Sequence, residues 1–326
     1  MEIGKIPNDI LKNIILDKIK ENRSEVLIRP KIGEDCCGID FEDNICVMSS
    51  DPITGTANEI GKLAVHISCN DIASCGSEPI GLLVTILAPP NATYNDLETV
   101  MKQLTGEAAS LNVDIVGGHT EITSAVNRFV LACTCIGKVK KEKMVTSSGA
   151  KPKDKIIVTK TVGLEGTAII AHEKENELER AFGREFVCKA KKYINNISVV
   201  KEGVLSGSFG VSAMHDVTEG GVLGALWEIA EASEVGVKVD NSLIPVGEET
   251  RQICEYYGIN PLKLISSGCM LITCSRGEAL VKLLGDNGIP AAIIGEVTED
   301  KRKVLLDNGM EIDIAQPGSD ELYKVV

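Results

Sequence analysis

The stretch that decides the fold reads His215-Asp216-Val217-Thr218-Glu219-Gly220-Gly221. It is followed by an apolar pattern with helical spacing over residues 222–232, so its glycines precede the first turn of a helix. The free N–H groups of a helix N-terminus attract anions, and glycine lets the backbone approach phosphate oxygens closely. We therefore predict that Asp216, Thr218, Gly220 and Gly221 belong to a binding site for an anion. The alternative is that Thr218 or Asp216 only caps the helix.

Four further stretches place a carboxylate beside glycines or small residues. They are Gly33-Glu34-Asp35, Ser49-Ser50-Asp51, Cys69-Asn70-Asp71 and Gly117-Gly118-His119-Thr120-Glu121. Hard cations such as Mg²⁺ take oxygen ligands, and protein-bound Mg²⁺ usually joins a few carboxylates to substrate phosphates. Acidic residues alone would repel a nucleotide, so this interpretation requires the metal as mediator. The pattern favours an enzyme that uses ATP and Mg²⁺.

The carboxylates are assigned roles according to their surroundings. The predicted Mg²⁺ ligands are Asp35, Asp51, Asp71 and Glu121. They would hold the metal against the β- and γ-phosphates, where charge must be neutralised during phosphoryl transfer. Asp71 lies among small and apolar residues, where an unpaired carboxylate is costly, and it is predicted to be catalytic together with Asp216. The alternative is that these aspartates only cap helices or close turns.

Other polar residues and glycines are predicted to contact the nucleotide. Gly117 and Gly118 would turn backbone N–H groups toward phosphate oxygens, although a plain tight turn is the competing interpretation. His119 would bind phosphate or only fill the turn, and Thr120 would add a hydroxyl. Lys160 would neutralise a phosphate, unless it is a solvated lysine at a strand end. Asn70 would hydrogen-bond a phosphate or orient Asp71.

Composition excludes several classes of function. The net charge of −13 argues against non-specific binding to nucleic acid or to an anionic membrane, since both favour basic surfaces. No run approaches the roughly 18 apolar residues of a membrane span, and residues 1–20 lack a signal-peptide core. The 11 cysteines are odd in number and form no C-x-x-C pair. They are expected to be reduced thiols of a cytoplasmic protein rather than disulfides.

The periodicity predicts an α/β protein of two domains. Helical spacing is found over 60–73 and 94–111, and strand-like runs are found over 44–49, 81–88, 114–117 and 128–137. The polar stretch over 140–154 contains Gly149 and Pro152, and it separates this half from a second half that begins with a strand over 155–159. We therefore predict domains over 1–150 and 151–326.

These motifs, in this order, resemble the superfamily of ATP-dependent enzymes related to aminoimidazole ribonucleotide synthetase. The resemblance covers almost the whole chain. Its anchors are Ile32-Gly33-Glu34-Asp35-Cys36-Cys37, Ser50-Asp51, Gly61-Lys62-Leu63-Ala64, Asn70-Asp71-Ile72-Ala73, Gly117-Gly118-His119-Thr120 and Asp216-Val217-Thr218-Glu219-Gly220-Gly221. The resemblance implies a PurM-like two-domain fold, with the N-terminal sheet forming a barrel across a homodimer. It also implies ATP in the cleft between domains or subunits.

Within the superfamily, the chain looks most like the hydrogenase maturation factor branch, whose members phosphorylate and dehydrate a thiocarboxamide on their own C-terminal cysteine. Here residues 321–326 contain no cysteine, and the last one is Cys274. His119 and Lys160 look more like selenophosphate synthetase, whereas thiamine-monophosphate kinase usually has an acidic residue at the place of His119. The leading hypothesis is an enzyme that activates a substrate oxygen by phosphorylation. The alternatives are a non-catalytic nucleotide-binding scaffold in a maturation complex, and a small-molecule kinase or synthetase.

Overall fold

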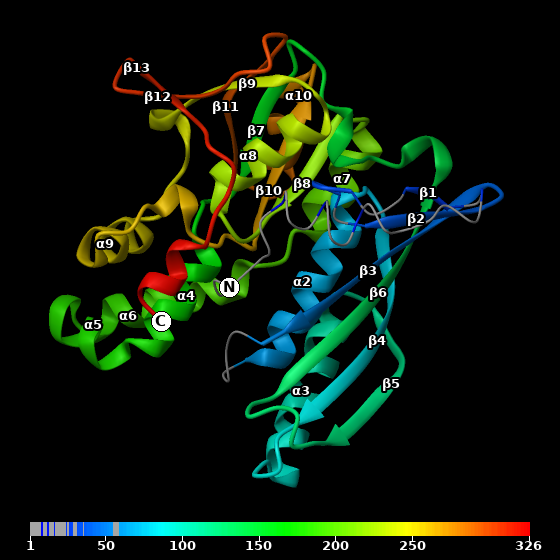
Figure 1. Ribbon diagram of the computed structural model, residues 1–326, viewed down its shortest axis with the longest axis vertical. Coiled ribbons are helices and arrows are strands. Elements are labelled where there is room, and N and C mark those ends of the chain that lie inside the picture. The colour runs from blue at the N-terminus through cyan, green and yellow to red at the C-terminus, as the bar shows by residue number, and fades with distance from the viewer. Residues whose placement is uncertain are drawn as a thin grey trace.

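The computed structural model describes residues 26–28, 31–34, 36–54 and 59–326, together with Asn8, Lys12, Leu16 and Ser24. The described strands form two sheets, one within the first 140 residues and one within the rest of the chain (Figure 1). Helices pack against both sheets. This architecture confirms the predicted α/β class with two domains.

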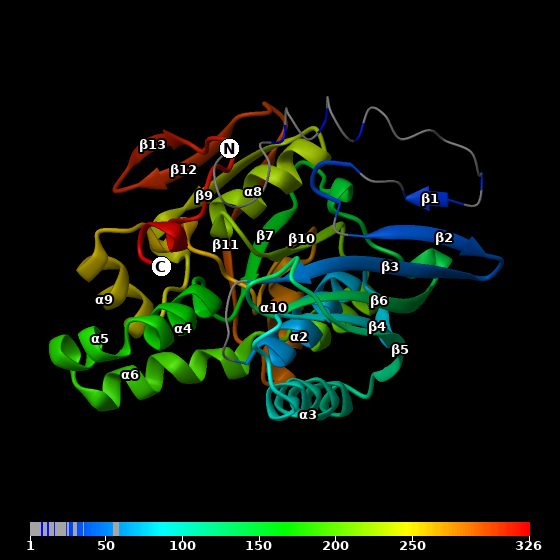
Figure 2. The same ribbon diagram turned by 60° about the horizontal axis from the view of Figure 1, so that its bottom comes forward.

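The first sheet has six strands, which lie in the order β1 (Val26–Ile28), β2 (Cys37–Phe41), β3 (Asn44–Ile53), β6 (Val130–Lys140), β4 (Glu78–Ala88) and β5 (Asp114–Ile122). Helix α2 (Ile60–Ser74) packs against β3, β6 and β4, and α3 (Tyr94–Ser110) packs against α2 (Figure 2). Most of α2 is buried, because its other side contacts β8 and α7 of the second domain. Thus α2 lies between the two halves of the molecule.

The second sheet has seven strands, which lie in the order β13 (Met310–Asp313), β12 (Lys303–Asp307), β9 (Gly236–Asp240), β11 (Ala291–Thr298), β7 (Lys155–Thr159), β10 (Cys269–Cys274) and β8 (Ala213–Val217). Helix α8 (Gly221–Ala232) packs on one apolar cluster of this domain, and α7 (Val200–Phe209) and α10 (Gly277–Asp286) pack on another. A third cluster joins a group of helices, which are α4 (Leu164–Glu173), α5 (Glu175–Phe182), α6 (Arg184–Lys191) and α9 (Glu248–Tyr257) (Figure 2).

The predicted turn at Gly117-Gly118 is wrong, because β5 continues through both glycines to Ile122. In this strand Gly118 has a φ of +147° and pairs with Val84 of β4. A Cβ atom added to Gly118 would lie 1.9 Å from the carbonyl oxygen of Val84. Gly118 is therefore required by the close approach of β4, and not by a reversal of the chain.

Glycines also let the two domains approach closely. A Cβ atom at Gly203 of α7 would lie 2.1 Å from the carbonyl oxygen of Ala73 in α2, and one at Gly207 would lie 2.6 Å from the Cα of Gly76. Two turns of α7 therefore lie directly against the end of α2 and the residues that follow it. A side chain larger than hydrogen would push the two domains apart.

We expect Gly203→Ala to lower the free energy of unfolding by roughly 1–3 kcal/mol, since the added methyl group overpacks a close contact between backbones. Urea unfolding followed by circular dichroism measures the change. Gly106→Ala in α3 is the matched control, because nothing lies within 4 Å of the added Cβ. That substitution should instead raise the free energy of unfolding by about 0.5–1 kcal/mol. Equal effects of the two substitutions would contradict the packing argument.

Candidate functional site

Two of the predicted metal ligands lie together around one hydroxyl group. Strand β3 carries Ser49 and Asp51, and α2 carries Asp71, which is 8% exposed. The Oγ of Ser49 lies 2.5 Å from Oδ2 of Asp71 and 3.1 Å from Oδ2 of Asp51. A hydroxyl has one hydrogen, so Ser49 can donate to only one of the two carboxylates at a time. The arrangement gathers two carboxylates and a hydroxyl, which are oxygen ligands of the kind that a hard cation takes.

Ser49 is a site residue that the sequence analysis did not assign. Successive residues of a strand point to opposite faces, so Ser49 and Asp51 lie on the same face of β3. That two-residue spacing was the available signal. The backbone of Asp71 is also held, because its carbonyl oxygen accepts hydrogen bonds from the Sγ of Cys36 at 3.0 Å and the Oγ of Ser74 at 2.6 Å.

Asn70 fastens α2 to the second domain. Its side chain is fully buried, its Nδ2 donates to the carbonyl oxygen of Ile197 at 2.8 Å, and its Oδ1 accepts from the backbone N–H of Val199 at 2.8 Å. Its oxygen and one amide hydrogen are therefore used on the backbone of the other domain. Of the two predicted roles, this geometry favours orienting Asp71 over contact with a phosphate.

Lys160, which follows β7, binds the same turn of residues 197–199 that Asn70 contacts. Its Nζ donates to the carbonyl oxygen of Ser198 at 2.6 Å and lies 2.5 Å from Oε1 of Glu202, whose side chain is 4% exposed. Lys160 also adopts a left-handed backbone conformation, with φ of +53°, which is uncommon for a residue with a side chain. The charge predicted to meet a phosphate is paired with Glu202, so Lys160 is not the solvated lysine of the alternative interpretation. Its contact with a phosphate stays a prediction.

The stretch that opened the sequence analysis forms the junction between β8 and α8; the helix was predicted, whereas the strand before it was not. Asp216 is 2% exposed near the end of β8, and α8 begins at Gly221. Gly220 and Gly221 have φ values of +86° and +62°, and a Cβ at Gly221 would lie 2.5 Å from the carbonyl oxygen of Leu262. The backbone N–H of Gly220 donates to Oδ2 of Asp320 at 2.7 Å. This N–H therefore has a carboxylate partner within the chain.

Within the chain, the structure does not bring the predicted phosphate and metal contacts of residues 117–121 to the Asp51–Asp71 pair. All five lie on the exposed edge strand β5. Asp51 pairs with Cys133 of β6, which pairs with Val84 of β4, which pairs with Gly118. Three strand spacings of about 4.8 Å separate the two groups by roughly 14 Å. His119 and Glu121 instead face each other, with 3.7 Å between Nε2 and Oε2.

The predicted ligand Asp35 lies outside the described residues. Its neighbour Gly33 is described, with φ of +82°, and a Cβ there would lie 3.0 Å from the carbonyl oxygen of Glu228 in α8. The turn that leads to Asp35 thus packs on the second domain. In the part of the chain that the structure describes, no group of three or more His, Cys, Asp or Glu side chains is arranged to hold a metal. A metal site at Asp51 and Asp71 therefore stays a prediction, and it would need Asp35 or ligand phosphates to complete it.

Two further buried polar contacts were not predicted. The Nε2 of His215 lies 2.8 Å from Oε2 of Glu228, which joins the residue next to Asp216 to α8. The carboxylate of Glu165 in α4 accepts hydrogen bonds from Ser267, in the loop before β10. Glu165 is 3% exposed, and burial raises its pKa to about 7. Neither contact has a local sequence signal, because each partner lies on a different element.

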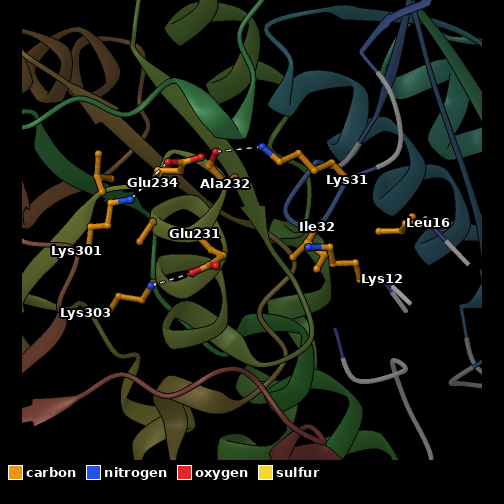
Figure 3. A pocket seen from close by; sticks show the side chains of 11 residues that line it. Lys12, Leu16, Lys31, Ile32, Glu231, Ala232, Glu234, Lys301 and Lys303 are labelled. Carbon is orange, nitrogen blue, oxygen red and sulfur yellow. Dashed lines mark hydrogen bonds and ion pairs between the residues drawn. The ribbon is translucent and has the colours of Figure 1, made fainter. Parts of the chain in front are cut away.

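A pocket of about 500 Å³ lies at the other end of α8 (Figure 3). Three of its four lysines have acceptors: Lys303 contacts Glu231 at 3.0 Å, Lys301 contacts Glu234 at 3.5 Å, and Lys31 contacts the carbonyl oxygen of Ala232 at 3.5 Å. Cations are favoured beside a helix C-terminus, so this cluster is explained by the end of α8. At 1.5 Å per residue, the helix separates it from Gly221 by roughly 17 Å. We do not place the site there.

Among the described residues, no helix is long and apolar enough to span a bilayer.

Two family models match the chain, and they correspond to its two sheets. The N-terminal domain of AIR synthase related protein matches residues 33–139, and the C-terminal domain of AIR synthase related protein matches residues 151–308. The chain therefore belongs to the AIR synthase related family, as the sequence resemblance predicted.

Named relatives from two branches of the family are similar to this chain. A protein of Methanocaldococcus jannaschii, provisionally named a hydrogenase expression/formation protein, is 27% identical over 93% of this chain and 91% of its own length. Carbamoyl dehydratase HypE of Cupriavidus necator is 28% identical over 77% of this chain and 71% of its own. Thiamine-monophosphate kinase of Pyrococcus horikoshii is 28% identical over 82% of this chain and 83% of its own. The chain is thus similar to the hydrogenase maturation branch and to a kinase branch.

Solved structures show the same PurM-like fold. A chain of a HypE–HypF complex superposes with a TM-score of 0.74 at 22% identity, over 94% of this chain and 99% of that one. A hydrogenase maturation protein HypE in complex with ATP gives a TM-score of 0.69 at 21% identity, over 98% and 93% of the two chains. At these identities the similarity establishes the two-domain fold.

Proposed function

We propose that this protein is an ATP- and Mg²⁺-dependent enzyme that activates an oxygen of its substrate by phosphorylation. The single observation that carries the proposal is the pairing of Asp51 with Asp71 around the hydroxyl of Ser49. Carboxylate and hydroxyl oxygens are the ligands that Mg²⁺ prefers, so the residues present fit this metal. When bound, Mg²⁺ would neutralise charge on the phosphates of ATP during transfer.

Each residue of the proposed site would have its own role in binding or positioning. Asp51 and Asp71 hold the cation from β3 and α2, while Ser49 keeps the two carboxylates in one orientation. Asn70 fixes the turn of α2 that carries Asp71, because its amide is bonded to the backbone of the second domain. Asp216 lies near the end of β8, a strand of the second domain that contacts α2. A reacting phosphate would therefore lie at the junction of the two domains.

The relatives support the class of chemistry more than the substrate. A carbamoyl dehydratase and a thiamine-monophosphate kinase are similar to this chain at almost the same identity. A chain of the HypE–HypF complex and the HypE–ATP structure share its fold. We therefore propose a HypE-like activity in hydrogenase maturation first, with a small-molecule kinase as the second candidate. A scaffold that binds nucleotide without turnover is the third.

Release of ADP and inorganic phosphate tests the proposal. The purified protein is incubated with ATP and Mg²⁺, alone and with a carbamoylated or thiocarboxamide-bearing peptide, thiamine monophosphate or buffer. Phosphate release stimulated by the peptide supports the HypE-like activity, whereas transfer to thiamine monophosphate supports the kinase. Tight ATP binding without turnover in every mixture would support the scaffold and overturn the enzymatic proposal.

We further propose a homodimer formed through the first sheet. Apolar side chains are exposed on β4 and the edge strand β5, which are Ile80, Leu83, Val116 and Ile122. An exposed edge strand with apolar residues favours pairing with another chain. A second copy would also bring the predicted phosphate contacts of β5 to a shared interface. By analogy with the HypE–HypF complex, a maturation partner protein is a further candidate for binding.

We expect the purified protein to have twice the mass of one 34.8 kDa chain in light scattering. Val116→Asp places a charge on an exposed apolar position, so it should yield a monomer that keeps its circular dichroism spectrum. Thr99→Asp, on the exposed side of α3, is the control and should leave the dimer intact. A wild-type protein that is monomeric at all concentrations would contradict the dimer.

A further inference from the structure

The segment Pro317–Lys324 lies over the turn that precedes α8. Asp320 is 2% exposed, and its carboxylate accepts three backbone N–H groups: Oδ2 accepts from Gly220 at 2.7 Å, and Oδ1 accepts from Ile265 at 3.1 Å and Leu322 at 2.8 Å. One side chain thus joins the turn before α8, the loop before β10 and its own segment. Figure 1 shows this segment, in red, beside α4.

Two more contacts fasten the segment to the same turn. The hydroxyl of Tyr323 donates to Oε1 of Glu219 at 2.8 Å. Pro317 covers Gly220, since a Cβ there would lie 3.1 Å from the Cβ of Pro317. Leu322 is 8% exposed and packs in the apolar cluster of the helical group. We call residues 317–324 the strap.

Glu165 is joined to the strap through the loop before β10. The next residue, Gly166, donates its backbone N–H to the carbonyl oxygen of Ile265 at 3.1 Å, and the N–H of Ile265 donates to Asp320. The carboxylate of Glu165 accepts hydrogen bonds from the side chain and backbone of Ser267, while its buried Oε2 has no hydrogen-bond partner in the part of the chain that is described. The charged or titratable groups that face it are Asp320 and Tyr323 of the strap and Glu219 of the turn. Burial disfavours the charged form of the Glu165 carboxyl, and the charges of Asp320 and Glu219 add to this effect. A proton on Glu165 removes one of the charges.

We propose that Asp320 is a positioning residue for the Thr218–Gly221 turn, and that the strap is fastened while Glu165 carries a proton. The proposal deepens the proposed function and rests on it, because that turn leads from Asp216 into α8. Asp320 holds the N–H of Gly220 in place from a segment a hundred residues away. Loosening the strap frees the turn and removes the fixed geometry at the start of α8.

The direction of the pH dependence follows from Glu165. Its pKa in the folded protein is raised from 4.5 to about 7 by burial, with the charges of Asp320 and Glu219 adding to the effect. The folded state therefore holds a proton that the unfolded state has lost. The resulting stabilisation is complete below the unfolded pKa, falls as the pH rises from 4.5, and is lost above about 7. The strap should loosen over the upper part of this range.

Hydrogen–deuterium exchange of the full chain, corrected for intrinsic rates, tests the proposal between pH 5.5 and 8.5. In the wild-type protein, exchange in residues 317–324 and 218–221 should rise together, about tenfold, as Glu165 ionises. Glu165→Gln cannot ionise and should abolish that rise. Asp320→Asn replaces one acceptor oxygen with a donor, so it should speed exchange in both segments about tenfold at pH 6. It should also raise the Kd for ATP and Mg²⁺ about tenfold.

Matched variants distinguish a loosened strap from a general loss of stability. Asp313→Asn, an exposed aspartate of β13, should change neither exchange nor the Kd. Tyr323→Phe removes only the bond to Glu219 and should speed exchange in 317–324 about threefold, which keeps the test open if Glu165→Gln does not fold. The proposal is overturned if Asp320→Asn loosens 317–324 and leaves 218–221 and the Kd within twofold of wild type. If the wild-type protein binds no ATP, the proposed function fails, while exchange in 218–221 still decides the role of Asp320.

Discussion

Asp71→Asn is expected to lower ATP turnover by about a hundredfold to a thousandfold. The amide keeps the shape of the carboxylate and can still accept a hydrogen bond from Ser49, but it carries no charge to hold Mg²⁺ against the phosphates. Removing one preorganised electrostatic contact to a developing charge typically costs this much in kcat. The measurement is initial-rate phosphate release at saturating ATP and Mg²⁺.

Two controls test whether the loss of turnover is specific to the carboxylate of Asp71. The circular dichroism spectrum of Asp71→Asn should match wild type, which excludes unfolding as the cause. Asp313→Asn, exposed on β13, should retain full turnover. Turnover by Asp71→Asn within threefold of the wild-type rate would contradict the assignment of Asp71 as a metal ligand and catalytic residue. The hydrogen bonds that hold the backbone of Asp71 would then have only a structural role.

Lys160→Met is expected to lower the free energy of unfolding by about 3–5 kcal/mol. Methionine keeps the length of the side chain but leaves the carboxylate of Glu202, which is 4% exposed, without its cation. The variant also loses the hydrogen bond to the carbonyl oxygen of Ser198. Because Asn70 holds the same turn from α2, the loss should weaken the junction of the two domains. Chemical unfolding with urea measures it.

The pair of variants Lys160→Met and Lys189→Met separates a buried ion pair from an exposed one. Lys189 contacts Glu185 at 3.0 Å, and both side chains are largely exposed, so its loss should cost no more than about 0.5 kcal/mol. Adding Glu202→Leu to Lys160→Met should recover much of the lost stability, since the buried charge is then removed. A cost below 1 kcal/mol for Lys160→Met would show that water reaches Glu202.

Much of the fold could be predicted from the sequence, because its elements have clear periodicity. The helical spacing over 60–73 and the apolar runs over 44–49 and 81–88 correspond to α2, β3 and β4. The glycine pair at 117–118 misled the prediction, because a turn and a close strand contact both require glycine. Only the position of Val84 distinguishes the two cases.

The candidate site could be predicted only in part, because several of its contacts join distant parts of the chain. Asp51 and Asp71 stand at the end of a strand and within a small-residue helix, and the structure brings them together. Asn70 and Lys160 both bind backbone groups of the turn 197–199, and Lys160 also pairs with Glu202, which no local spacing can indicate. The strap contact of Asp320 with Gly220 likewise joins residues a hundred positions apart. Sequence motifs found the carboxylates, whereas the contacts that position them required the fold.

The most direct test of the central claim is thermal unfolding with ATP, with Mg²⁺ and with both, for wild type and Asp71→Asn. A ligand present at a thousand times its Kd stabilises the native state by about 4 kcal/mol. We predict a clear rise in the wild-type Tm that requires ATP and Mg²⁺ together and is nearly absent in Asp71→Asn. An unchanged Tm in every mixture, or an equal rise with ATP alone in both proteins, would contradict a metal-mediated nucleotide site at Asp51 and Asp71.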